Sequence, residues 1–270
     1  MIELPCHSVP AHRTPWRTWF PTGYPGLGSL TEHIRATGHG RWWADRPRNP
    51  RAGAVACAGH VLLGGDPRVL APGALAPFAR SYVAAPDRFL PLLGAAFVRL
   101  VPWERMVWVR EDTTGRTAAP AGTTVRPLTA ADTPAVRALG TDLSWLAESW
   151  GGPAALAASG HTQGAFHDGR LLALACTYFL GGRYEDIAVA TLPPARGRGL
   201  ARACVTALSA DITTRGRTPS WTCSRDNHPS RALAAATGFR LVREYVHYAT
   251  GAAADPAGRG QRLPAGLPTA

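Results

Sequence analysis

Short apolar runs and one long amphipathic stretch organise the second half of the chain. Within residues 199–214, Leu200, Cys204, Leu208 and Ile212 recur every four positions, which gives a helix one apolar face. The pattern predicts strands at 123–126, 163–167, 171–179, 184–191, 220–223 and 241–248, and helices from 129 toward 139 and over 143–149, 153–159 and 229–237. This order predicts a mixed α/β sheet with helices on its faces.

Turn and capping residues support these elements. The pair Asp168-Gly169 lies between two strand-like runs and predicts a tight hairpin. Thr129 and Asp132 have the spacing of a capping box, with Asp in place of the usual Glu. Gly238 closes the helix that precedes the last strand.

Changes of composition predict the domain organisation. The stretch 112–122 is rich in Thr, Ala and Gly and interrupts the regular pattern. We therefore predict an N-terminal domain at 1–115, a linker at 116–122, a second domain at 123–250 and a disordered tail at 251–270. The N-terminal domain has a strand-like run at 54–63 and a helix-like run at 73–83, which predict a smaller α/β or α+β fold.

The charge pattern adds one alternative. The formal net charge is +11, and lysine is absent, so arginine supplies the basic side chains other than histidine. A basic surface can bind nucleic acid, but these arginines are dispersed and form no dense run with aromatic residues. Nucleic-acid binding is therefore the weakest of the functions considered.

Composition also bears on location and on metals. No apolar run has the length of a membrane span, and the N-terminus lacks the pattern of a signal peptide, so a cytoplasmic location is expected. The cysteines are dispersed, at positions 6, 57, 176, 204 and 223, and the histidines have no metal-ligand spacing. We expect reduced cysteines and no metal site.

The turn at 196–201, Arg-Gly-Arg-Gly-Leu-Ala, has the chemistry of a phosphate site. It lies between a predicted strand and the amphipathic helix. Glycines let backbone N–H groups converge on a phosphate, and a helix N-terminus adds partial positive charge. Arg196, Arg198 and Arg202 add full charges. The motifs of P-loop and dinucleotide-binding proteins are absent, and an arginine-rich turn without a ligand is the alternative reading.

These residues resemble a known superfamily. Arg196, Gly199 and Ala201 match the [QR]-x-x-G-x-[GA] signature of the GNAT N-acetyltransferases. Residues 220–227, followed by Ser230, Leu233 and Gly238-Phe239, are similar to the strand, the Asn-started helix and the closing "GF" of that superfamily. Residues 221–239 and Glu244-Tyr245, and more weakly 38–50, resemble its zwittermicin-A-resistance branch.

The resemblance implies a fold and a binding mode. Acetyl-CoA is expected where two parallel strands of a mixed sheet, 187–191 and 220–223, splay apart. The expected contacts are main-chain groups of Val189, Ala190 and Thr191 to the pantetheine, the turn Arg196, Gly197, Arg198, Gly199, Leu200 and Ala201 to the pyrophosphate, and Asn227 and Ser230 near the thioester. For Asn227, a helix-capping role is at least as well supported.

The resemblance also nominates catalytic groups. Glu185 stands about where some members carry the general base; Asp186 is the weaker candidate, and a solvated strand-end carboxylate is the alternative. Many members protonate the leaving thiolate with a Tyr four residues before the "GF" glycine, but this chain has Ala234 there. Tyr245, Tyr248 or water could replace it.

The sequence therefore predicts an acetyl-CoA-dependent N-acetyltransferase that acts on a primary amine of a small molecule, as a monomer or homodimer. Residues 1–115 are expected to form one wall of the acceptor cleft. A non-catalytic acyl-CoA-binding regulator is the principal alternative, since the tyrosine is missing. The sequence does not name the acceptor.

Overall fold

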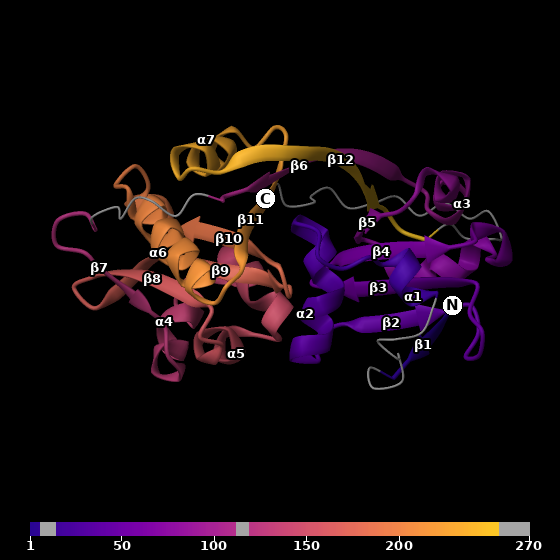
Figure 1. Ribbon diagram of the computed structural model, residues 1–270, viewed down its shortest axis with the longest axis horizontal. Helices are drawn as coiled ribbons and strands as arrows, with labels where there is room; N and C mark the ends of the chain where they lie inside the picture. Colours follow the sequence, from indigo (N-terminus) through magenta and orange to yellow (C-terminus); the bar gives the residue numbers. More distant parts are fainter. Residues whose placement is uncertain (6–14, 112–118, 254–270) are drawn as a thin grey trace. The chain divides into compact units, whose positions relative to one another are not determined.

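The computed structural model describes residues 1–5, 15–111 and 119–253, which form two compact units (Figure 1). Unit 1 comprises Met1–Pro21, Gly40–Arg105 and Tyr245–Ala270, and unit 2 comprises Thr22–His39 and Met106–Glu244. The two strands β6 (Leu100–Val109) and β12 (Arg240–Thr250) each contribute residues to both units. The units are thus interleaved along the chain, which differs from the consecutive domains expected at 1–115 and 123–250. Residues 116–118 of the expected linker and 254–270 of the expected tail lie outside the described residues.

Unit 2 is built on a mixed sheet whose strands follow the predicted pattern closely. Its strand order is β6-β11-β10-β9-β8-β7, in which β10 and β11 are parallel, and the pairs β10–β9, β9–β8 and β8–β7 are antiparallel. The strands are β7 (Thr124–Pro127), β8 (Thr162–His167), β9 (Arg170–Leu180), β10 (Tyr184–Thr191) and β11 (Thr218–Ser224). The helices are α2 (Leu30–Thr37), α4 (Thr133–Arg137), α5 (Pro153–Ala158), α6 (Leu200–Thr214) and α7 (His228–Ala236).

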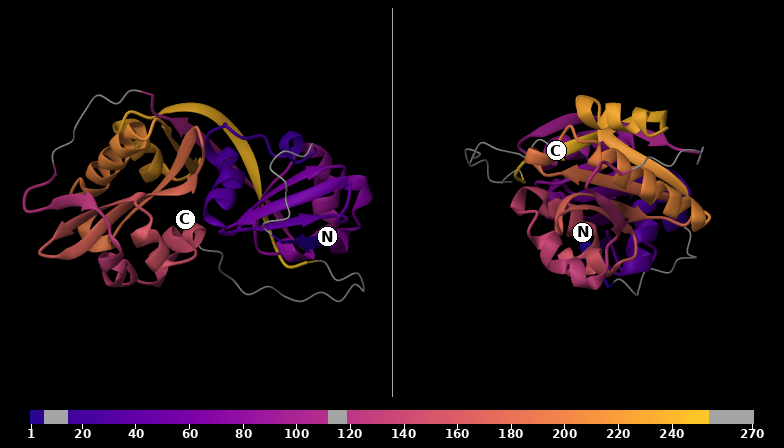
Figure 2. Two further views of the ribbon diagram at one scale, coloured as in Figure 1. Left: turned by 60° about the horizontal axis from the view of Figure 1, so that its bottom comes forward. Right: turned by 90° about the vertical axis from the view of Figure 1, so that its left-hand side faces the viewer.

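Helical layers cover both faces of this sheet, as Figure 2 shows. The apolar face of α6 packs with Ala173 and Ala175 of β9, whereas the intervening Leu174 and Cys176 pack with the layer that contains α4 and α5. A strand buried on both faces carries an unbroken apolar run rather than an alternating one. This explains why residues 171–176 are apolar throughout.

Several local predictions for unit 2 are confirmed. Asp168 and Gly169 have φ angles of 49° and 73° and form the tight turn between β8 and β9. Thr129 and Asp132 form the capping box, which opens a 3₁₀ turn at Ala130–Asp132 before α4. The predicted helix at 143–149 is also a 3₁₀ helix, at Thr141–Trp150.

The segment Thr22–His39 belongs to unit 2 because α2 packs against β9. Its buried His33 has Nε2 2.7 Å from the Ser149 carbonyl oxygen, while its Nδ1 accepts a hydrogen bond of 3.0 Å from the Leu180 amide. Since Nδ1 accepts, the ring is neutral and Nε2 donates. Burial lowers the pKa of His33 to about 4, although the hydrogen bond to Ser149 opposes this.

Unit 1 has its own set of strands and its own core. Its strands are β1 (Ile2–Leu4), β2 (Arg41–Ala44), β3 (Ala52–Cys57), β4 (His60–Gly65) and β5 (Tyr82–Ala84), followed by the C-terminal part of β12 beside β5. Its helices are α1 (Trp16–Trp19) and α3 (Leu90–Ala96). Leu75, Phe78, Phe89 and Leu93 pack on one face of the sheet. On another part of the sheet, the ring of Trp16 lies 5.7 Å from that of Trp42.

Two predictions for this region were wrong. The run 54–63 is not one strand but the hairpin β3–β4, because Ala58 and Gly59 take φ angles of 48° and 74° and turn the chain. The run 73–83 is a 3₁₀ helix, Pro72–Phe78, followed by β5, since Pro77 cannot take part in a continuous α-helix.

Candidate functional site

The parallel strands β10 and β11 pair over only part of their length. They pair from Tyr184 opposite Thr218 to Ile187 opposite Trp221. Within the part of the chain that the structure describes, no further pairs join them, although β10 continues to Thr191 and β11 to Ser224. The other edge of β10 remains paired with β9 throughout this stretch. Main-chain groups of Val189, Ala190 and Thr191 thus lie along an edge of β10 without a neighbouring strand.

A β-bulge lies at the point where the two strands part. β9 pairs Phe179 with Asp186 and Thr177 with Ile187, so Tyr178 is an extra residue in the ladder. A bulge bends its strand and increases the local twist, which turns neighbouring strands away from each other. The bulge therefore gives the opening a local physical cause.

The glycine turn follows β10 as predicted. Gly197 and Gly199 have φ angles of 76° and 77°, and Gly199 caps the N-terminus of α6. A side chain is disfavoured at such angles, and the exposed backbone of both glycines can be approached closely. Arg196 and Arg198 are exposed, and Arg196 Nε donates a hydrogen bond of 3.4 Å to the Thr191 carbonyl. The turn is thus tied to the end of β10.

Asn227 and Ser230 hold the start of α7. The Asn227 side chain accepts a hydrogen bond of 3.1 Å from the Ser230 amide, so the capping interpretation is confirmed. The Ser230 hydroxyl accepts a bond of 3.0 Å from Trp221 Nε1, at the last paired position of β11. These bonds fix α7 to β11 where the strands part; proximity of either residue to a thioester stays a prediction.

Glu185 is completely buried and surrounded by cations. Its carboxylate accepts hydrogen bonds from Arg215 at 3.0 and 2.8 Å, from Arg217 at 2.9 Å and from the Thr177 hydroxyl at 2.5 Å. His161 Nδ1 lies 3.5 Å from Oε2, an ion-pair distance if the ring is protonated. Burial alone would raise the pKa of Glu185, but its interactions with His161 and Arg215 hold it well below its usual range.

Asp186 occupies a different environment beside β11. Its Oδ1 accepts hydrogen bonds from the hydroxyls of Ser220, at 3.0 Å, and Thr222, at 3.1 Å. Ser220 Oγ in turn accepts a bond of 3.3 Å from the Gly26 amide. Asp186 is buried, and it precedes the last paired residue of β10. It therefore lies closer along the strand to the opening than Glu185 does.

The comparisons identify the family to which this arrangement belongs. The model of a family described as GNAT acetyltransferase matches residues 111–248, just over half of the chain. The chain belongs to the GNAT acetyltransferase family. Members of this family are acyltransferases that use acetyl-CoA as cosubstrate. The superfamily and enzyme class predicted from the sequence are thereby confirmed, whereas the zwittermicin-A-resistance branch stays a prediction.

Relatives of this GNAT protein cover most of its length. An uncharacterized N-acetyltransferase in the mutA 5′ region of Streptomyces virginiae is 56% identical over 216 residues, 80% of this chain and 90% of the relative. A GCN5-related N-acetyltransferase-like protein from Streptococcus suis 89/1591 has a TM-score of 0.65 at 18% identity, covering 86% of this chain and 95% of that one. A tandem GNAT protein from the clavulanic acid biosynthesis pathway has a TM-score of 0.57 at 14% identity, covering 92% and 96%. Together these structures confirm the mixed α/β fold.

The positions considered for the general acid of the GNAT enzyme lie in unit 1 or carry no acidic group. Ala234, on α7, is buried in the core. Tyr245 belongs to unit 1, where its ring lies 5.0 Å from that of His247, and Tyr248 pairs with Val83 in the same unit. Among the described residues, no group of three or more His, Cys, Asp or Glu side chains could hold a metal ion, and no helix is long and apolar enough to cross a membrane.

Sequence reasoning missed the partners of the strand carboxylates. Arg215 and Arg217 flank Gly216 between α6 and β11, and no motif marks them. Gly26 lies 194 residues from Ser220, so its amide could not be connected to β11 by spacing. The one available signal was the charge itself, because a buried strand carboxylate requires cations or hydroxyls nearby.

Proposed function

We propose that unit 2 transfers the acetyl group of acetyl-CoA to a primary amine of a small molecule, with the cosubstrate in the opening between β10 and β11. The observation that carries this proposal is the end of strand pairing at Ile187 and Trp221 beside the glycine turn. The unpaired edge of β10 is thus followed along the chain by a turn suited to binding phosphate.

The pantetheine arm of the cosubstrate binds along the edge formed by residues 189–191. Its amide groups can pair with backbone N–H and C=O groups as an added strand would. The pyrophosphate binds to the backbone of residues 197–201, where the first amides of α6 have no acceptor within the helix. Arg196, Arg198 and Arg202 supply solvent-screened charge around it.

The reaction is a direct attack of the amine nitrogen on the thioester carbonyl. A C–N bond forms and a tetrahedral oxyanion develops, which a backbone N–H of the open β10 edge stabilises. Collapse of this intermediate breaks the C–S bond and expels CoA as a thiolate. The amine loses one proton, and the thiolate accepts one.

Asp186 is the better-supported acceptor for the amine proton. The base first predicted, Glu185, has its carboxylate enclosed by Arg215 and Arg217, and a pKa held low makes it a poor proton acceptor. We therefore assign Glu185 the role of an ion-pair anchor for β10. Asp186 is bound by the hydroxyls of Ser220 and Thr222, on either side of the last paired residue of β11, and can receive a proton directly or through water.

Protonation of the thiolate is assigned to water, since Ala234 has no acidic group. Tyr245 as the general acid stays a prediction from the sequence.

The test is release of CoA thiol when the full chain is given acetyl-CoA and a panel of small primary amines. We expect thiol release that requires the amine, together with acceptor that has gained the mass of one acetyl group. Matched tertiary amines, which cannot form the neutral amide, are the control. Saturable acetyl-CoA binding without turnover of any amine would favour the non-catalytic regulator instead.

A further inference from the structure

Unit 1 repeats the strand pattern that makes the opening in unit 2. β4 pairs antiparallel with β3 on one edge and parallel with β5 on the other. The parallel pairing runs from His60 opposite Tyr82 to Leu62 opposite Ala84, where β5 ends. β4 continues to Gly65, still paired with β3. The chain therefore has a second place where a strand extends beyond its parallel partner.

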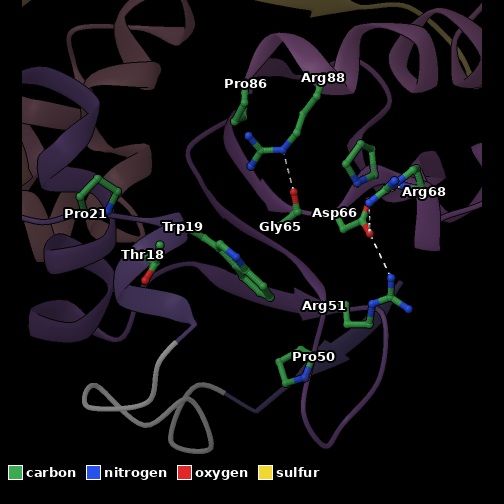
Figure 3. A pocket seen from close by; sticks show the side chains of 11 residues that line it. Thr18, Trp19, Pro21, Pro50, Arg51, Gly65, Asp66, Arg68, Pro86 and Arg88 are labelled. Atoms are coloured by element: carbon green, nitrogen blue, oxygen red, sulfur yellow. Dashed lines mark hydrogen bonds and ion pairs between the residues drawn. The ribbon is translucent and has the colours of Figure 1, made fainter.

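A hollow of about 1070 Å³ lies at this second opening (Figure 3). It is lined by residues that follow β4 and β5, by residues that precede β3, and by the end of α1. The lining residues used below are Trp19, Arg51, Gly65, Asp66, Arg68 and Arg88. All of them belong to unit 1.

The charge of the lining favours an anion. It contains three arginines and one aspartate, a formal charge of +2. Asp66 accepts hydrogen bonds from Arg51 at 3.0 Å and from Arg68 at 3.0 and 3.3 Å. The hydrogen bond from Arg68 is the main reason that the pKa of Asp66 is lowered to about 2, so its charge is present at neutral pH. One carboxylate thus orients two guanidiniums without neutralising the lining.

Arg88 is held separately. Its Nε donates a hydrogen bond of 2.9 Å to the Gly65 carbonyl, which fixes the guanidinium at the hollow (Figure 3). The structure gives its terminal nitrogens no acceptor among the described residues. A guanidinium fixed through Nε can present both terminal nitrogens to a carboxylate or phosphate.

The lining also has apolar members, Trp19 and the prolines at 21, 50, 67 and 86. Two glycines, Gly65 in the lining and Gly64 before it, allow close packing there. A Cβ at Gly64 would lie 2.6 Å from Trp19 Cβ, and one at Gly65, where φ is 93°, would collide with the Arg51 carbonyl oxygen. The indole of Trp19 offers a flat surface to a ring or another apolar group.

The segment beside the hollow differs from the glycine turn of unit 2, residues 196–201. The segment after β4 is Asp66 and the 3₁₀ helix Pro67–Val69, without a pair of left-handed glycines before a long α-helix. We propose that this hollow is a second ligand site, which binds a small organic anion through its guanidiniums and the apolar body of that ligand on Trp19. The ligand class is a carboxylate or a phosphate monoester on a ring-sized apolar group. This inference does not depend on the acetyl-transfer proposal.

The experiment follows the indole N–H resonance of Trp19 in the full chain, assigned with Trp19→Phe. Phenyl phosphate, benzoate and neutral benzyl alcohol are titrated separately, without CoA. We expect saturable shifts with one or both anions and none with benzyl alcohol; the two anions distinguish a phosphate from a carboxylate ligand. Equal shifts with benzyl alcohol, or none with either anion, would overturn the proposal.

Variants locate the anion within the hollow. Arg88→Gln and Arg51→Gln should each weaken anion binding about five- to tenfold, the effect of losing one exposed charge-assisted hydrogen bond. The control is Arg41→Gln, an arginine of unit 1 on β2 that does not line the hollow and should leave the affinity unchanged. Equal weakening in all three variants would show a non-specific charge effect. If calorimetric titration showed that the wild type binds a second equivalent of CoA and that Arg88→Gln does not, the proposed ligand class would be wrong.

Discussion

The openings of the two units share a topology but present different groups to a ligand. In unit 2, the turn after β10 offers backbone amides at Gly197 and Gly199, and the arginines beside them are exposed. In unit 1, the turn after β4 begins with Asp66, and arginine side chains line a hollow. The strand arrangement creates the opening in both units; in the two proposals above, the turn that follows decides whether backbone or side chains bind an anion.

The openings also differ in their capacity for proton transfer. The residue just before the last parallel pair is Asp186 in β10 and Val61 in β4. A buried valine cannot accept a proton. This difference supports the proposal that acetyl transfer takes place in unit 2.

The largest expected effect on activity comes from Asp186, the carboxylate that the opening of unit 1 lacks. Asp186→Asn should lower kcat about 10²–10⁴-fold, because general-base assistance is worth that much. The measurement is steady-state thiol release with the best amine, together with calorimetric binding of acetyl-CoA, which should persist. Asp168→Asn is the control, since its exposed side chain lies in the β8–β9 turn and Asn also tolerates its positive φ. Full activity in Asp186→Asn would leave water as the proton acceptor.

Removal of the buried charge at Glu185 should destabilise unit 2. Glu185→Gln leaves Arg215 and Arg217 without their counter-ion, and breaking such a buried pair costs about 3–5 kcal/mol. Urea unfolding and hydrogen exchange in β9–β11 measure the loss. Glu3→Gln is the unit 1 counterpart; its partner Arg41 lies 3.6 Å away on the surface, so a change near zero is expected.

The pH dependence of folding stability tests whether the charge of Glu185 is stabilising. Since its folded pKa is lowered, the ion pair stabilises the protein above the ordinary carboxyl pKa, and that contribution is lost as the pH falls below it. Glu185→Gln should therefore flatten the acid limb of the stability curve. An unchanged acid limb would mean that the pKa of Glu185 is the same in the folded and unfolded protein, which would contradict a stabilising ion pair.

Acid should weaken both units through buried neutral histidines, a point on which the comparison predicts similarity. Burial lowers the pKa of His33 in unit 2 to about 4 and that of His60 in unit 1 to about 3. Folded histidines of this kind bind fewer protons than unfolded ones, so stability falls as the pH drops below about 6.5. For the fully buried His33 the loss amounts to about 3 kcal/mol by pH 4. Unfolding at pH 7 and pH 5, in wild type and His33→Gln, measures it; equal slopes would contradict it.

Prediction from sequence succeeded where a local pattern has one physical solution. The 184–191 strand, the Asp168-Gly169 turn and the α6 stripe could all be predicted, because periodicity and turn chemistry are encoded within a few residues. The hairpin at Ala58-Gly59 was missed because a non-Gly residue with positive φ gives a weak turn signal. Long-range partners, such as Arg215 for Glu185 and Gly26 for Ser220, depend on tertiary packing and carry no local signal.

The two openings differ in their signals as well. The Arg-Gly turn marked the opening of unit 2 because its residues match a family signature. The hollow in unit 1 draws on α1, the residues before β3, the end of β4 with the residues after it, and the segment after β5, and its arginines are dispersed among many others. No spacing in the sequence indicates that Arg51, Arg68 and Arg88 meet.

Backbone recognition in unit 2 predicts a strong effect at Gly199. Gly199→Val should weaken CoA binding about 30- to 100-fold, because a branched side chain disfavours the φ of 77° and hinders close approach of the pyrophosphate. Gly160→Val is the matched control, since Gly160 has a φ of 73° and open space around it, but lies in the turn before β8. Calorimetric titration of CoA separates them. A neutral result at Gly199 would place the pyrophosphate elsewhere.

The smallest expected effect comes from Arg198→Ala, and it tests the comparison most directly. Arg198 is exposed beside the turn, so its charge is screened by solvent, and its loss should cost on the order of 1 kcal/mol, about fivefold in Kd. The difference between variant and wild type should shrink further as salt is raised, since a surface charge acts only within a short screening distance. The same titration, repeated at low and high ionic strength, measures both quantities. In unit 1, the corresponding loss of Arg88 should matter at least as much, because there the guanidinium itself contacts the anion. If Arg198→Ala weakened CoA binding more than Gly199→Val, side chains would bind the anion in both units, and the distinction between backbone and side-chain recognition would fail.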